Sequence, residues 1–225
     1  PGFLKVRAGS SEVITTIMLN YIASLSIFFL LSNWTLIQRE DGTQPISKAL
    51  ADYIVIPGIL PIPELRLHLG FVVALAAAAV VSWFLFRTTR GFELRAAGLN
   101  LDAARYAGMG ASSSIIAAMA ISGALAGMGG AFEVTGTIKQ FSTVVSGGVG
   151  FTAIAIALVG GTRPSGVVAT ALVFGALRNG GGLMGLETSI PIDLLFFIQA
   201  LVIMFIAAPN LTARIIRMPF QRRRK

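Results

Sequence analysis

RAAGLNLDAARYAG, residues 95–108, lies between two long apolar stretches and interrupts an otherwise membrane-like sequence. The segment predicts a short polar helix. Four arginines lie in it or shortly before it: Arg87, Arg90, Arg95 and Arg105. Membrane proteins keep Lys and Arg on the cytoplasmic side. We therefore expect the polar loop, residues 87–111, to orient the chain in a membrane and to present a cytoplasmic surface to a partner.

The composition agrees with a membrane protein. The chain is 55% hydrophobic and 12% charged, about half the charged fraction of an ordinary soluble domain. The net charge is +8, and six of the eighteen Lys and Arg residues lie within residues 214–225. There they favour contact with anionic lipid headgroups over binding of nucleic acid. The absence of cysteine excludes disulfides, thiolate nucleophiles and cysteine metal sites in this sequence.

Apolar stretches long enough to cross a bilayer predict an all-α fold, a polytopic transmembrane helix bundle with broken or re-entrant helices and a cytoplasmic helix in the polar loop. We expect one domain over residues 1–225, truncated at its N-terminus because it begins with Pro1 and has no signal peptide. The expected spans are residues 13–31, 69–86, 112–136, 143–161, 165–186 (broken) and 190–208. The run at residues 54–62 contains prolines and predicts an interfacial segment.

The glycine-rich sequence GGTRPSG, residues 160–166, separates two apolar runs at 151–159 and 167–177. Neither run alone crosses a bilayer, so they predict broken or re-entrant helices, or spans completed by weakly polar flanks. Interrupted helices in transporters commonly mark the translocation pathway.

Two pairs of small residues predict helix packing. Gly123 and Gly127 form a GxxxG pair, and Ala171 and Gly175 repeat the spacing. Small residues let helix backbones approach closely in lipid.

Polar residues inside the expected spans are candidates for contact with a solute. Asn20 lies within the first span and Glu133 near the end of the third. Such groups usually face a cavity or a partner. The alternatives are an ion pair between Glu133 and Lys139, and a bond from Asn20 to a neighbouring helix backbone.

Nothing in the sequence predicts a catalytic residue, a metal site or a cofactor site. No GxxxxGK[ST] motif occurs, and residues 160–166 lack the lysine and spacing of a phosphate loop. The one histidine, His68, has no Ser or Asp partner at triad-like spacing. The energy for any transport must therefore come from elsewhere.

Asp102-Ala103-Ala104, three residues and Gly108 follow the EAA pattern of binding-protein-dependent ABC importer permeases. Residues 95–136, together with SSEVITTIMLNYIA (10–23) and the stretch at 148–181, resemble the permease family for branched-chain amino acids, simple sugars and nucleosides. The nucleoside-type members are the most similar. The chain departs from the pattern in that Asp102 replaces a glutamate and the usual Leu-Pro ending is absent.

The resemblance implies the C-terminal part of a longer permease subunit of an ATP-driven ABC importer for nucleosides or simple sugars, in the inner membrane of a prokaryote with a cytoplasmic C-terminus. The implied partners are cytoplasmic ABC ATPase subunits that bind ATP and Mg²⁺, a second permease (itself or a paralogue), an extracytoplasmic solute-binding protein and lipid. The polar loop would then be a coupling loop that docks on the ATPase through Arg95, Asp102, Ala103, Ala104, Arg105 and Gly108. Phe141 and Phe151 join Asn20 and Glu133 as expected pathway residues, because aromatic rings stack on the rings of such solutes.

Two other classes of function remain open from the sequence. A secondary transporter or channel driven by an ion gradient predicts paired carboxylates at mid-depth, whereas the acidic residues here lie near span ends. A membrane scaffold accounts for the small-residue pairs and not for the glycine-rich break.

Overall fold

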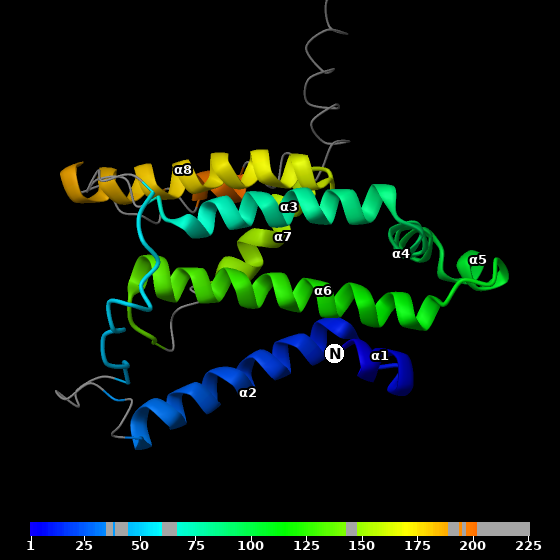
Figure 1. Cartoon of the computed structure of the whole chain (residues 1–225), viewed down its shortest axis with the longest axis horizontal. Coiled ribbons are helices and arrows are strands. Elements are labelled where there is room, and N and C mark those ends of the chain that lie inside the picture. The colour runs from blue at the N-terminus through cyan, green and yellow to red at the C-terminus, as the bar shows by residue number, and fades with distance from the viewer. Residues whose placement is uncertain are drawn as a thin grey trace, which may run out of the picture. The chain divides into compact units, whose positions relative to one another are not determined.

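The computed structural model describes residues 1–34, 38, 45–59, 67–142, 148–188, 194 and 197–201. Two compact units divide the chain, Pro1–Gly147 and Gly148–Lys225. Every named element within the described residues is a helix, and the β contacts there are isolated bridges. Figure 1 shows these helices, which confirm the all-α polytopic class predicted from the sequence.

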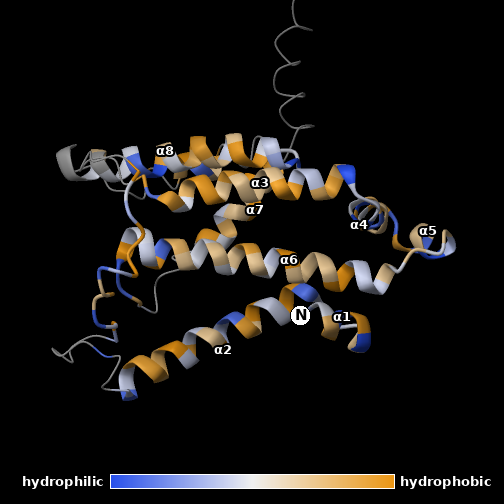
Figure 2. Cartoon of the chain, viewed as in Figure 1, coloured by the Kyte–Doolittle hydropathy of each residue, from blue (hydrophilic) through white to orange (hydrophobic). Residues whose placement is uncertain are grey.

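Three stretches of the first unit are long and apolar enough to cross a membrane. They are α2 (Glu12–Asn33), α3 (Leu69–Arg87) and α6 (Ala111–Phe132) with its continuation. They cover the sequence-predicted spans 13–31, 69–86 and 112–136. The nineteen residues of α3 rise about 28 Å, close to the roughly 30 Å of a hydrocarbon core. Figure 2 shows the hydrophobic colour concentrated along these helices, as expected of a multi-pass membrane protein.

A π-helix, η1 (Glu133–Ile138), extends α6 by six residues. It closes where the amide of Lys139 donates to the carbonyl of Val134 at 2.8 Å and Lys139 adopts a left-handed conformation, with φ of 58°. The α6–η1 helix therefore runs slightly past the predicted limit at residue 136.

The segment 45–59 is hydrogen-bonded to η1 and to the residues that follow it. Ser47 donates its amide to Phe141 at 2.8 Å and accepts the amide of Phe141 on its hydroxyl at 2.7 Å. The amide of Leu50 donates to Lys139 at 2.9 Å, and that of Ile56 to Thr135 at 3.2 Å. The described part of the run predicted to be interfacial thus lies against the protein at this end of α6 (Figure 1).

The second unit contains α7 (Val149–Val159) and α8 (Pro164–Thr188), which pack against each other. At eleven residues, α7 is about 16 Å long and too short to cross a bilayer by itself. The turn between them is tight: a Cβ at Gly160 would lie 2.6 Å from the amide nitrogen of Val167. Gly161 and Thr162 both have positive φ, at 65° and 56°.

The interruption expected within residues 165–186 is not present, because α8 is one continuous helix. Each glycine costs a helix only about 1 kcal/mol relative to alanine, so a long helix tolerates several of them. The chain breaks instead where φ becomes positive, at residues 161–162. Residues 143–147 of the predicted span 143–161, most of 190–208 and the basic tail lie outside the described residues.

Candidate functional site

Thr88 joins the end of α3 to the start of α4 (Thr89–Leu99). Its hydroxyl donates to the carbonyl of Phe84 at 2.6 Å and accepts the amide of Gly91 at 3.0 Å. One side chain therefore satisfies an unpaired carbonyl of one helix and an unpaired amide of the next.

Gly91 lets α3 and α4 touch where they join. We call this junction, residues 84–91, the elbow. It is buried, and a Cβ there would lie 2.7 Å from both Cα and the carbonyl oxygen of Leu85, and in contact with the carbonyl oxygen of Phe84. Because glycine has no side chain, the backbone of α4 can lie directly against the last turn of α3. Neither Thr88 nor Gly91 was predicted from the sequence, where the one available signal was that threonine is a common N-cap residue.

Asn100 divides the polar loop into two helices where the sequence predicts one. It ends α4 and caps α5 (Leu101–Tyr106), its side-chain oxygen accepting the amides of Asp102 and Ala103 at 3.0 Å each. Asparagine competes for backbone amides in this way and so ends helices as well as starting them.

Three charged residues of the predicted coupling set contact their own chain. The guanidinium of Arg95 lies 4.8 Å from the centre of the Phe86 ring on α3, a cation–π contact that further fixes the elbow. Arg105 and Asp102 form an exposed ion pair at 3.4 Å. Such exposed pairs contribute little stability, so both groups remain available to a partner.

The two alanines of the EAA-like sequence face opposite ways. Ala104 is 3% exposed, and α5 packs against α6, whereas Ala103 is exposed. Gly108 has a φ of 74° and turns the chain towards α6. Ala104 therefore serves the internal packing of the loop, and Ala103 lies on its outer face.

Two further residues of the polar loop were not predicted from the sequence. Leu99 directly precedes Asn100, and Tyr106 is the last residue of α5. They are 90% and 94% exposed. Large apolar side chains exposed next to polar residues are typical of protein contacts. We call the outer face formed by Leu99, Asp102, Ala103, Arg105 and Tyr106 the coupling surface.

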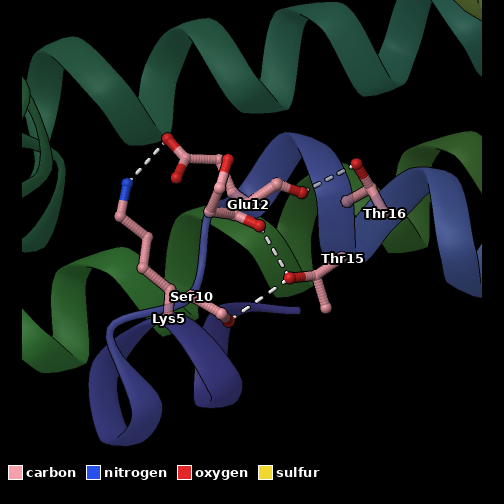
Figure 3. Close-up of polar contacts among 6 residues, drawn as sticks. Lys5, Ser10, Glu12, Thr15 and Thr16 are labelled. Atoms are coloured by element: carbon pink, nitrogen blue, oxygen red, sulfur yellow. Dashed lines mark hydrogen bonds and ion pairs between the residues drawn. The ribbon is translucent and has the colours of Figure 1, made fainter.

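A cluster of polar residues at the start of α2 lies near the N-terminal end of α6, the end that α5 also contacts. Lys5 of α1 (Gly2–Ala8) forms an ion pair with Glu12 at 2.7 Å, and Ser10 and Thr15 share a hydrogen bond at 3.3 Å (Figure 3). A Cβ on Gly2 would lie 3.3 Å from Cα of Ile116, so α1 packs on α6. The acidic group that opens an apolar helix is thereby neutralised.

The predicted pathway residues lie on several different elements. Asn20 is exposed on α2 and Phe151 is 76% exposed on α7, in the other unit. Glu133 and Phe141 lie at the η1 end of the first unit. Within the described residues, Glu133 accepts from Thr137 at 3.4 Å and forms no ion pair with Lys139.

In the part of the chain that the structure describes, the predicted packing glycines have open space where a side chain would project. A Cβ at Gly123, Gly127 or Gly175 would have no neighbour within 4 Å, and Ala171 is exposed. Helix packing at these positions stays a prediction about further helices. The close backbone contacts involve other glycines, at positions 91, 160 and 166.

His68 has two hydrogen-bond partners that were not predicted from the sequence. It caps α3 by accepting the amide of Gly70 on Nδ1 at 3.2 Å, and its Nε2 lies 3.5 Å from Oγ1 of Thr137. The threonine is 69 positions further along the chain, so no local pattern indicates the contact.

Residues 1–207 match the protein family described as branched-chain amino acid transport system / permease component. The guanosine ABC transporter permease protein NupP of Bacillus subtilis is 42% identical over 92% of this chain and 60% of its own length. The nucleoside ABC transporter permease protein NupB of Lactococcus lactis is 37% identical over 92% of this chain and 58% of its own length. The glucose ABC transporter permease protein TsgB13 of Haloferax volcanii is 33% identical, over 92% of this chain and 56% of its own length. No solved structure matches the chain.

Proposed function

Because this chain belongs to the permease family of the branched-chain amino acid transport system, we propose that it forms part of the translocation pathway of an ATP-driven ABC importer for nucleosides or simple sugars. The chain spans about 60% of the length of these relatives, so the proposal concerns a longer protein. The observation that carries it is the coupling surface, which is joined to a membrane-spanning helix through a close-packed elbow.

The elbow supports a mechanical role. A partner that moves α5 also moves α4, because the two helices share Asn100 as their cap. The movement of α4 is then passed to α3, because the hydrogen bonds of Thr88 and the close backbone contact at Gly91 leave the two helices little freedom to move separately. Motion of this kind opens a pathway alternately to the two sides of a membrane.

The proposed partner at the coupling surface is a cytoplasmic ATPase dimer that holds ATP and Mg²⁺. The arginines of the loop and the basic residues at 214–225 favour the cytoplasm for both segments, including the C-terminus. A second permease and an extracytoplasmic solute-binding protein complete the proposed complex. The assembly belongs in the inner membrane of a prokaryote.

Reconstitution tests the proposal. The full-length permease, its ATPase and its solute-binding protein are placed in vesicles, and uptake of labelled guanosine and glucose is measured with and without ATP. We expect ATP-dependent uptake of one solute class. Uptake that follows an ion gradient in the absence of the ATPase would instead establish the alternative, a secondary transporter.

Polar residues along one side of α2 support a pathway there. Thr16, Asn20 and Ser24 follow Glu12 at intervals of four, which places neighbours in the series on one side of a helix. Thr16 donates to the carbonyl of Glu12 at 2.8 Å, whereas the Asn20 amide has no hydrogen-bond partner within the described residues. A bare amide is costly in lipid, so we propose that this side faces water and a neutral, hydroxyl-bearing solute.

Labelling of single cysteines on α2 should show which side of the helix is accessible to water. This chain contains no cysteine, so Thr16→Cys, Asn20→Cys and Ser24→Cys are unique labels within it. We expect a membrane-impermeant thiol reagent to label them, and transported solute to slow the labelling. Met18→Cys and Leu25→Cys, on the opposite side, are the matched controls and should stay unlabelled. Equal labelling of both sets would contradict a pathway along α2.

A further inference from the structure

His68 lies where three parts of the first unit meet. Its Nδ1 accepts the amide of Gly70 at 3.2 Å and so caps α3. Its Nε2 lies 3.5 Å from Oγ1 of Thr137 on η1, and this hydroxyl donates to the carboxylate of Glu133 at 3.4 Å. The backbone of His68 also forms a β-bridge with Gly58. The side chain therefore connects α3 to η1 while its backbone binds the segment 45–59.

The imidazole is held between two glycines. A Cβ at Gly70 would lie 2.7 Å from Cε1 and Nδ1 of His68, and a Cβ at Gly136 would lie 2.7 Å from Cδ2, Cε1 and Nε2. A side chain at either glycine would therefore overlap the ring, which lies close to both backbones and has little room to turn away from its partners.

This arrangement requires a neutral imidazole. The amide of Gly70 can only donate, so Nδ1 carries no proton and the neutral ring has its proton on Nε2. Nε2 then donates to Thr137, and Thr137 donates to Glu133. The donors follow one another in a single direction, from the ring to the carboxylate.

A second proton on the ring removes the cap. Two donors would then face each other at Nδ1, and a cation would lie at the positive end of the α3 dipole. The carboxylate of Glu133 attracts an imidazolium, but it is exposed and reaches the ring only through Thr137. Within the described residues, the charged groups of the elements around the ring are Glu133, Lys139, Lys48 and Asp52, and α3 carries none before Arg87.

We propose that His68 is a proton-sensitive positioning residue, which holds the first turn of α3 against η1 while it is neutral and releases it when protonated. Histidine is the side chain whose charge changes between about pH 5 and about pH 8. His68 is the one histidine of this chain. Its exposure to the extracytoplasmic pH rests on the membrane orientation given under the proposed function; the contact itself does not.

Hydrogen exchange in the full-length permease, held in lipid nanodiscs, tests the proposal. The measured quantity is the amide exchange rate of residues 67–72, corrected for the intrinsic effect of pH. We expect the wild-type rate to rise about fivefold between about pH 7.5 and about pH 5.5, as for the loss of a helix cap. His68→Asn supplies an acceptor that gains no proton, so its rate should be low at both values.

Two comparisons make the experiment decisive. His68→Leu, which has no acceptor, should exchange fast at both pH values, and residues 116–128 of α6 should give the same corrected rate in every protein. A wild-type rate that does not change with pH, or a pH dependence that persists in His68→Asn, overturns the proposal. The comparison of wild type with His68→Asn decides the matter even if His68→Leu does not fold. Neither ATPase nor solute is needed, so failure here is distinct from failure of the proposed transport.

Discussion

Gly91→Leu is expected to separate α4 from α3 and to abolish ATP-driven uptake. A side chain at this position would overlap the backbone of the last turn of α3, where a Cβ would lie only 2.7 Å from Leu85 Cα. Overpacking typically costs 1–3 kcal/mol, and backbone yields less readily than the end of a flexible side chain. We expect the thermal unfolding midpoint of the purified permease to fall by several degrees and the coupling surface to lose its fixed position.

Gly98→Ala is the matched control for this substitution. It lies in the same helix, α4, and a Cβ there would meet no described atom within 4 Å. Alanine is a better helix former than glycine by about 1 kcal/mol, so the midpoint should stay constant or rise. If Gly91→Leu matched Gly98→Ala in both unfolding and uptake, the elbow would not be the mechanical link.

The double variant Leu99→Ala, Tyr106→Ala is expected to fold normally and to lose its ATPase. Both side chains are almost fully exposed, so their truncation removes few contacts within the chain. Buried anchors at an interface contribute about 2 kcal/mol or more, so losing even one weakens binding by about thirtyfold. Titration of the purified ATPase onto immobilised permease measures this change.

Tyr53→Ala provides the comparison at the other end of the first unit. Tyr53 is 88% exposed in the segment 45–59, so it is similar in kind and in exposure. Its truncation should leave the affinity for the ATPase unchanged. Unchanged affinity in the Leu99/Tyr106 variant as well would place the ATPase contact elsewhere on the permease.

The spans of the first unit could be predicted from the sequence because each is a long, continuous apolar run. Hydropathy alone locates α2, α3 and the α6–η1 helix to within a few residues. The helices of the second unit were harder to predict. Glycines predict breaks in a helix, but α8 continues through the glycine triplet at residues 180–182. Composition does not reveal whether a glycine in a helix lies at a contact, at a turn or in open space.

The candidate site shows the same limit at the level of single residues. The EAA-like pattern located α5, because Ala103, Ala104 and Gly108 follow each other within about two helical turns. It did not separate the outer Ala103 from the buried Ala104, since that depends on the direction in which α6 continues. The contacts of Gly91 with the preceding helix and of His68 with Thr137 exist only in three dimensions, so no periodicity indicates them.

The π-helix constrains how this protein can change in length during evolution. One residue inserted into, or deleted from, an α-helix rotates everything beyond it by about 100°. Within residues 133–138, such a change would turn Gly136 and Thr137 away from His68 and shift the carbonyls that bind the segment 45–59. Insertions and deletions should therefore be rarer in this stretch of related permeases than in a loop of the same size.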